Sequence, residues 1–238
     1  MEQLLAGPPE AAAATLKAAA QGGVVQAQLV YGQWLLDGHG VVPDAPQAYK
    51  WFRHASREGE PMALNMLGQC HAHGWGVTVS LVMAAYWFRL AALGGLDWGM
   101  YNYATALSLG LGTDIDRDAA ITWFRQAAAL GHAKSMNMIG SFYEDGWVVA
   151  QSSQDALVWY RQAAQAGDFR GQFNLARLLM AKGQTPAALQ WLARVPETAT
   201  PAFIRQAIIW LQDHFPDLPL PQSLAAAATA TLAAPSSC

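Results

Sequence analysis

Three residues with reactive or metal-binding side chains, Cys70, His71 and His73, lie close together in the chain. They could suggest a metal site, but residues two positions apart on a helix point in different directions, and no second cluster of ligands follows. Cys70 could also suggest a nucleophile, yet the sequence offers no pair of residues that would orient it. We therefore predict no metal ligand and no catalytic residue here, and we expect His73 to face a groove.

A second candidate is the run of residues 114–118, Asp-Ile-Asp-Arg-Asp, whose spacing of carboxylates is similar to the opening of a calcium-binding loop. The sixth and twelfth positions of such a loop need glycine and glutamate, but here they are Ala119 and Arg125. We expect Asp116 to cap a helix instead. The Gly-x-Ser-x-Gly, Gly-Lys-Ser/Thr and His-Glu-x-x-His motifs are also absent from the sequence. The sequence therefore predicts a protein without enzyme activity, cofactor or bound metal.

The segments that carry these residues belong to a pattern that recurs every 36 residues. Its clearest element is a tryptophan followed by an aromatic residue and an arginine, at Trp51, Trp87, Trp123 and Trp159. A period in this range indicates an array of structural repeats, in which each unit buries its apolar face against its neighbours. We expect these tryptophans to be buried between successive helix pairs. Trp123→Ala should then lower the free energy of unfolding by about 3–5 kcal/mol.

Each repeat is predicted to hold two helices, which we call helix A and helix B, joined by a glycine-containing loop. Helix A carries a small residue, which indicates close approach of a neighbouring helix, at Gly32, Gly68, Ala104, Gly140 and Ala176. The loops begin at Gly38, Gly74, Gly110 and Gly146, where a left-handed residue can end a helix. Helix B follows the predicted N-cap residues Asp44, Ser80, Asp116 and Ser152. It ends at Gly59, Gly95, Gly131 and Gly167.

The ends of the array differ from its centre, because a terminal helix has only one neighbour against which to pack. A shortened loop precedes Trp191, and Thr185-Pro186 is expected to supply a cap and a first-turn proline. The predicted organisation is a flexible N-terminus at 1–9, a solenoid at 10–195, a C-terminal capping helix at 201–215 and a flexible Ala/Pro-rich tail at 216–238. Within that tail, Ser223 could cap a short alanine-rich helix. Within the solenoid we expect a half repeat at 10–23, repeats at 26–59, 62–95, 98–131 and 134–167, and a degenerate repeat at 170–195.

The composition limits the classes of partner. The 238 residues are 53% hydrophobic, which is enough for a continuous core. Lys and Arg number 14 against 17 Asp and Glu, so the net charge of −3 provides no basic field for nucleic acid. Two cysteines, Cys70 and Cys238, cannot build a disulfide framework. No signal peptide or transmembrane segment is recognisable, so we expect a cytoplasmic protein without membrane insertion.

These features resemble those of the Sel-one-like repeat (SLR) family, a branch of the tetratricopeptide-repeat superfamily. The resemblance covers residues from about 10 to 195 and rests on the Leu-Gly of helix A (67–68), the Gly-x-Gly loops (38–40 and 74–76) and the helix-B string (156–167). Val148, in place of the second loop glycine, and Ala104, in place of the helix-A glycine, depart from the pattern. The resemblance implies an all-α, right-handed solenoid that acts as a non-catalytic adaptor or scaffold. Its partner would be a protein or peptide in bacterial signalling, regulation or complex assembly.

The family fold would place helix A on the concave face of the solenoid. The residues expected to point into that groove form a polar strip flanked by aromatics: Asn65, Gln69, Tyr101, Thr105, Asn137, Ser141, Phe173 and Arg177. Carboxamides at repeat spacing can donate to and accept from an extended peptide backbone. Alternatively, the asparagines only solvate an exposed face. If they bind, Asn65→Ala with Asn137→Ala should abolish capture of a partner without lowering stability.

Two other functions stay open. A homo-oligomeric structural module would use exposed aromatic residues, with Trp34, Trp75, Trp98 and Trp147 as the candidate interface. These side chains could equally pack between repeats or against loops. An enzyme accessory subunit is the other alternative. Light scattering separates the adaptor from the oligomer, because a monomer at all concentrations would exclude the oligomer.

Overall fold

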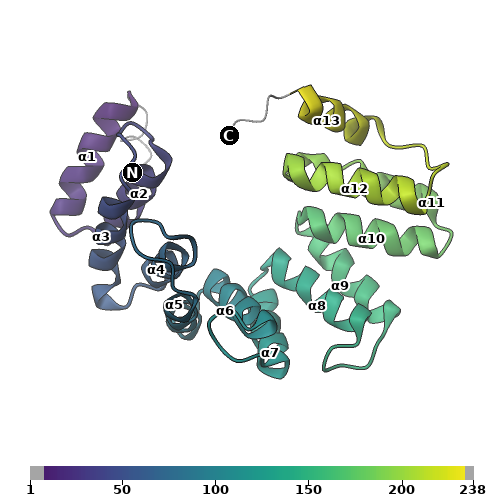
Figure 1. The fold of residues 1–238 in the computed structure, drawn as a ribbon, viewed down its shortest axis with the longest axis horizontal. Helices are drawn as coiled ribbons and strands as arrows, with labels where there is room; N and C mark the ends of the chain where they lie inside the picture. The colour runs from purple at the N-terminus through teal and green to yellow at the C-terminus, as the bar shows by residue number, and fades with distance from the viewer. Residues whose placement is uncertain (1–7, 234–238) are drawn as a thin grey trace. The chain divides into compact units, whose positions relative to one another are not determined.

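The computed structural model describes residues 8–233, whose helices are drawn in Figure 1. This part of the chain contains thirteen α-helices and no strand, which confirms the predicted all-α fold of repeated helix pairs. The chain divides into two compact units, Met1–Ala127 and Ala128–Cys238, which we call the N-terminal unit and the C-terminal unit. The predictions made for residues 1–7 and 234–238, including Cys238, lie outside the described residues.

The N-terminal unit begins with a single helix, α1 (Pro9–Gln21), at the place of the predicted half repeat. Helix pairs follow: α2 (Val25–Asp37) with α3 (Ala45–Ala55), α4 (Pro61–His73) with α5 (Leu81–Leu93), and α6 (Asp97–Leu109) with α7 (Arg117–Ala129). The last two residues of α7 belong to the C-terminal unit. A short 3-10 turn, η2 (Ser56–Glu58), extends α3. From α1 to α6, each helix packs against the next one along the chain (Figure 1). In each pair the first helix is helix A and the second is helix B.

The C-terminal unit contains two more pairs and two terminal helices: α8 (Ala133–Asp145) with α9 (Ser153–Gln165), α10 (Phe169–Ala181) with α11 (Thr185–Leu192), then α12 (Pro201–His214) and α13 (Gln222–Ala233). The helix α12 lies where the capping helix is predicted. The helix α13 differs from the expected flexible tail. Leu224 is fully buried in the core of this unit, and Ser223 Oγ donates to the Ala193 carbonyl at 2.8 Å. These two contacts hold the alanine-rich segment against the unit.

Most predicted helix ends are confirmed. Each predicted N-cap side chain accepts a hydrogen bond of 2.9–3.3 Å from a backbone N–H in the first turn of helix B: Asp44, Ser80, Asp116 and Ser152. The glycines that end helix A have φ values of 71–76°, in the left-handed region: Gly38, Gly74, Gly110 and Gly146. One prediction is wrong, because Thr185 is the first residue of α11 and caps nothing. Gln184 takes the N-cap position there without a side-chain hydrogen bond.

The buried aromatic ring of each helix B is the residue after the tryptophan. The rings that are buried are Phe52, Phe88, Phe124 and Tyr160. The tryptophans, expected to be buried, are only partly so: Trp51, Trp87, Trp123 and Trp159. Consecutive side chains on a helix point about 100° apart, so only one of two adjacent rings can face helix A. Trp123 instead packs edge-on against Tyr103, with ring centroids 6.0 Å apart.

The small residue of helix A makes room for that buried ring. A Cβ at Gly32 would lie 2.6 Å from Phe52 Cε1, and a Cβ at Gly140 would lie 2.5 Å from Tyr160 Cδ1. Real Cβ atoms do not come so close to a ring, so alanine at either position would displace it. The close contact predicted for helix A is therefore present, and its partner is the aromatic ring of helix B in the same repeat.

The second loop glycine allows one repeat to pack on the preceding one. Gly112 has a φ of 74°, and a Cβ there would overlap the backbone of Leu81 at the start of α5. Gly40 and Gly76 approach the backbone of a preceding helix in the same way. In the fourth repeat Val148 replaces this glycine and has a φ of 53°. A β-branched residue rarely adopts this conformation.

Candidate functional site

The eight predicted site residues lie on helices A of both units. In the N-terminal unit, α4 carries Asn65 and Gln69, and α6 carries Tyr101 and Thr105. In the C-terminal unit, α8 carries Asn137 and Ser141, and α10 carries Phe173 and Arg177. The two halves of the set have different chemistry.

The two asparagines of the predicted strip are buried and hydrogen-bonded between helices. Asn65 and Asn137 each expose only 5% of their surface. The Oδ1 atom of Asn65 accepts a hydrogen bond of 2.8 Å from Asn102 Nδ2, and Asn137 Oδ1 accepts one of 3.0 Å from Asn174 Nδ2. Each bond joins two successive helices A. Removing the acceptor would leave a partly buried amide donor unpaired, which costs up to about 1–3 kcal/mol, so the expectation that both asparagines can be replaced without loss of stability does not fit this geometry.

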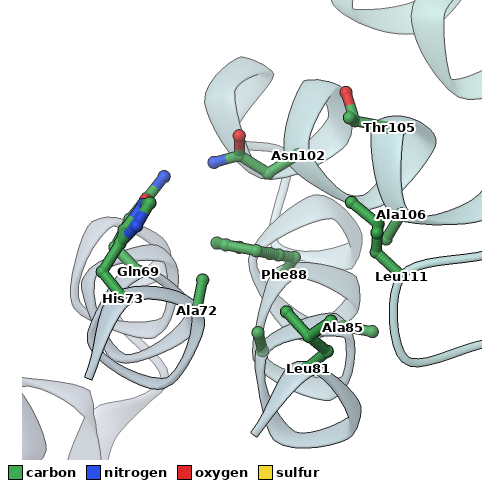
Figure 2. A pocket seen from close by; sticks show the side chains of 11 residues that line it. Gln69, Ala72, His73, Leu81, Ala85, Phe88, Asn102, Thr105, Ala106 and Leu111 are labelled. Carbon is green, nitrogen blue, oxygen red and sulfur yellow. The ribbon is translucent and has the colours of Figure 1, made fainter. Parts of the chain in front are cut away.

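A groove lies between α4 and α6, with α5 as its floor, in the N-terminal unit (Figure 2). Its volume is ≈ 230 Å³. The polar lining residues are Gln69, His73, Asn102 and Thr105. The apolar lining residues are Ala72, Leu81, Ala84, Ala85, Phe88, Ala106 and Leu111. The structure thus brings Gln69 and Thr105 together as predicted, whereas Asn65 and Tyr101 are not lining residues.

The lining defines what this groove can hold. Figure 2 shows Gln69 and His73 on one side and Asn102 on the other, with the Phe88 ring between them. His73 Nε2 lies 3.0 Å from Gln69 Oε1, and the His73 ring stacks on Trp75 at a centroid distance of 4.9 Å. Among the described residues, none of those that line the groove is Asp, Glu, Lys or Arg. The floor therefore suits a neutral apolar side chain, while amide groups at the rim can pair with a peptide backbone.

The corresponding place in the C-terminal unit holds a network of polar side chains. Seventy-two residues after Gln69, Ala72, Phe88 and Thr105 stand Ser141, Glu144, Tyr160 and Arg177. Arg177 Nη2 donates to Glu144 Oε2 at 2.6 Å, and the Tyr160 hydroxyl donates to the same oxygen at 2.7 Å. Ser141 Oγ lies 3.2 Å from the Tyr160 hydroxyl oxygen. These side chains join α8, α9 and α10, so Ser141 and Arg177 contact neighbouring helices.

The pKa shifts in this network favour one fixed set of charges. Burial alone would raise the pKa of Glu144, but the hydrogen bonds from Arg177 and Tyr160 and the charge of Arg177 outweigh burial and lower it. Burial alone would lower the pKa of Arg177, but the hydrogen bond and the charge of Glu144 outweigh burial and raise it. Burial, aided by Glu144, raises the pKa of Tyr160. Glu144 and Arg177 therefore stay charged and Tyr160 stays neutral near pH 7, as in a structural ion pair.

Phe173 is covered by the helix that follows the repeats. Its ring lies edge-on to Phe203 and to Trp210 of α12, with centroid distances of 5.7 and 5.5 Å. The guanidinium carbon of Arg177 lies 5.9 Å from the centre of the Trp210 ring. The capping helix thus occupies the face on which Phe173 was predicted to hold a peptide side chain. The repeat pattern did not reveal this contact, because α12 has no counterpart within the repeats.

Cys70, His71 and His73 lie on the same helix, α4, but their side chains have different surroundings. Cys70 is fully buried, and burial raises the pKa of its thiol to about 12, which disfavours the reactive thiolate. His71 is buried edge-on to Tyr49 at 5.7 Å, while His73 faces the groove as predicted. Residues 8–233 contain no group of three His, Cys, Asp or Glu side chains placed to hold a metal ion. No helix in the same range combines the length and apolar character needed to cross a membrane.

The four tryptophans proposed for an oligomer interface fall into two classes. Trp34 packs on His39 and Trp147 on Phe142, with centroid distances of 4.4 and 5.5 Å, and both are partly buried. Trp75 and Trp98 are more exposed, at 36% and 39% of their surface. Trp75 also stacks on His73, and Trp98 lies edge-on to Tyr101 at 6.2 Å, so all four rings have aromatic neighbours and the two classes differ in exposure.

A family model described as Sel1 repeat matches four successive segments of this chain, residues 25–60, 61–96, 99–132 and 133–168. A comparison with curated proteins gives no match. Among solved structures, a protective antigen of uropathogenic Escherichia coli displaying an SLR fold is 28% identical over 93% of this chain and 48% of that chain, with a TM-score of 0.70. A Sel1 repeat protein from Oxalobacter formigenes is 27% identical over 86% of this chain and 59% of that chain, with a TM-score of 0.73.

This chain therefore spans about half to three fifths of the length of those two proteins. A third structure, from Klebsiella pneumoniae, is 16% identical over 83% of this chain and 98% of that chain, with a TM-score of 0.56, and supports the fold alone. The four segments matched by the family model make up more than half of the 238 residues. The chain belongs to the Sel1 repeat family.

Proposed function

We propose that the chain is a non-catalytic adaptor that binds a partner protein or peptide through the groove between α4 and α6. Sel1 repeat proteins generally mediate interactions between proteins, and the scaffold is generally non-catalytic. The observation that carries the proposal is the open groove of the N-terminal unit, with its apolar floor and amide rim. An adaptor of this kind would serve bacterial signalling, regulation or complex assembly.

The proposed occupant is an extended segment that places one neutral, apolar side chain on Phe88. Burying that side chain against Phe88, Leu81 and Ala106 supplies the favourable free energy, at about 25 cal/mol for each Å² of apolar surface removed from water. Gln69 and Asn102 at the rim can hydrogen-bond the peptide backbone on either side of it. A charged side chain is disfavoured, because the described residues that line the groove offer no countercharge.

The C-terminal unit suggests the variant that tests the groove. Ala72→Glu with Thr105→Arg introduces the residue types of Glu144 and Arg177 at the matching positions, where an ion pair would close the groove. The matched control is Ala129→Glu with Thr122→Arg, which makes the same two changes at exposed positions of α7. Peptides selected from a display library on the wild-type protein should lose binding to the groove variant and keep binding to the control. Retention by both variants would place the binding surface elsewhere.

A second candidate function is homo-association through α5, and a specific observation favours it. This helix exposes a set of large apolar side chains: Leu81, Val82, Met83, Tyr86 and Leu93. Contiguous exposed apolar surface often marks a site of association between proteins. Light scattering over a range of concentrations tests it, with Val82→Lys and Tyr86→Lys as the disrupting changes. A wild-type protein that is monomeric at every concentration would exclude this function.

A further inference from the structure

The N-terminal unit contains a second pocket, and the described residues that line it are all basic side chains or histidine. Lys50, Arg53 and His54 of α3 and Arg57 of η2 surround a volume of ≈ 260 Å³, which we call the basic pocket. Their spacing of three, four and seven residues places them on one face of the helix. Asp and Glu are absent from residues 45–57, although acidic residues outnumber basic ones in the whole chain.

Within the described residues no acidic side chain forms an ion pair with the basic pocket, and this includes Glu58, the residue that follows Arg57 in η2. All four side chains are exposed. Within residues 8–233, none of them takes part in an ion pair or a side-chain hydrogen bond. The one ring contact is that of His54 with Trp51, at a centroid distance of 5.9 Å. Three permanent positive charges on one helix face repel one another, so the arrangement is destabilising unless an anion joins it.

Comparison with the other repeats shows that the basic pocket is particular to the first helix B. Arg53 recurs in every repeat, as Arg89, Arg125 and Arg161. The positions matching Lys50, His54 and Arg57 hold uncharged residues in the other three: Tyr86, Leu90 and Leu93, then Thr122, Gln126 and Ala129, then Val158, Gln162 and Gln165. Basic residues near a helix C-terminus stabilise it through the macrodipole. The macrodipole has this effect in all four helices B, so it does not explain why the additional basic residues occur only in the first of them.

We propose that the basic pocket binds a carboxylate-rich segment of a partner protein, at a site separate from the groove. The planar guanidinium groups of Arg53 and Arg57 match carboxylates in geometry and can form paired hydrogen bonds with them. Lys50 adds a third charge that can turn toward whichever carboxylate comes near. The positive charge is confined to one pocket on a chain of net charge −3, which suits a short acidic segment better than the long field of a nucleic acid.

The test uses fluorescently labelled hexaglutamate as the probe and hexaglutamine as the neutral control, with binding followed by fluorescence anisotropy at low ionic strength. Wild-type protein should bind hexaglutamate and not hexaglutamine. Arg53→Glu and Arg57→Glu should each weaken hexaglutamate binding by about tenfold, because each removes one attraction and adds one repulsion. Circular dichroism checks that both variants fold, as expected for exposed positions, and Lys50→Gln provides a milder change in the same pocket.

Arg161→Glu is the matched control. It occupies the repeat position of Arg53 and alters the net charge equally, but its neighbours Val158, Gln162 and Gln165 are uncharged. The affinity of the Arg161→Glu variant for hexaglutamate should stay within about twofold of the affinity of the wild-type protein. Equal weakening by Arg161→Glu and Arg53→Glu would overturn the proposal, because net charge alone would then control binding. Failure of wild type to bind hexaglutamate would overturn it too, and so would preference for inorganic phosphate or phosphatidylserine vesicles.

Discussion

Two adjacent aromatic residues on each helix B have unequal roles in the core, and Phe124 with Trp123 provides the comparison. Phe124 is fully buried, whereas Trp123 is partly exposed. We expect Phe124→Ala to lower the free energy of unfolding by about 3–5 kcal/mol, the usual result of emptying a large buried site. Trp123→Ala should lower it less, although tryptophan is the larger residue. Urea denaturation measures both, and a greater loss for Trp123→Ala would contradict the assignment of the buried ring.

The repeat pattern could predict that one of these rings is buried but not which one. Both recur with the same period, so periodicity carries no information on which side chain faces helix A. The glycine of helix A, as at Gly32, indicates close packing without naming the ring that fills the space. The hydrogen bonds of Asn65 and Asn137 could not be predicted for a related reason, since their partners Asn102 and Asn174 belong to other repeats.

Glu144 makes the stability of the C-terminal unit depend on pH in a predictable direction. Its folded-state pKa is lowered from 4.5, so the ionised form stabilises the folded protein. That contribution is complete above the unfolded pKa and is lost as pH falls through the folded one. Glu144→Gln should therefore destabilise the protein most near neutral pH, and the difference from wild type should shrink at about pH 3. Chemical denaturation at both pH values measures this difference in the free energy of unfolding.

Asp168, whose pKa is raised by burial, is present in both proteins, so its contribution to the pH dependence cancels in the comparison. An unchanged difference would show that the carboxylate charge is not the stabilising feature.

At the scale of elements, the loop of the fourth repeat contains a strained residue that can be relieved. The left-handed conformation of Val148 costs a non-glycine residue about 1–2 kcal/mol. Glycine there would remove the strain but lose about 0.5–1 kcal/mol to the greater freedom of the unfolded chain. Val148→Gly should therefore raise stability by up to about 1.5 kcal/mol and raise the Tm in calorimetry. Gly112→Ala should do the reverse, because its Cβ would overlap the Leu81 backbone. A lower Tm for Val148→Gly would show that the valine side chain makes a contact worth more than the strain.

The elements inside the repeats were predictable because four copies show the same capping residues and the same glycines at one spacing. Asp44 and Ser80, for example, mark the start of helix B by the same chemistry. Elements outside the repeats were harder to predict. The contact of α12 with Phe173 and the helix around Leu224 depend on single apolar side chains, and no second copy shows where such side chains pack.

At the scale of the whole molecule, repeats of one fold carry two surfaces of opposite chemistry. The groove is neutral and apolar at its floor, whereas the basic pocket consists of unpaired positive charge. The same helix-pair framework supports both, because the residues that differ between repeats lie on the surface while the buried ring and the small residue recur. A partner with an apolar residue and an acidic run at a suitable spacing would engage both and gain affinity from their linkage.

Ionic strength should separate these two surfaces in a single experiment. Raising salt shortens the Debye length from about 10 Å at 0.1 M to about 3 Å at 1 M, which screens the exposed charges of the basic pocket. Hexaglutamate binding should therefore weaken steeply over this range. Neutral peptides selected on the groove should bind as well or slightly better, because salt does not screen apolar contacts and many salts strengthen them. Parallel titrations of both ligands against wild-type protein measure the two slopes. Equal weakening would mean that both ligands use one electrostatic site, and the assignment of separate surfaces to α3 and to the α4–α6 groove would then be wrong.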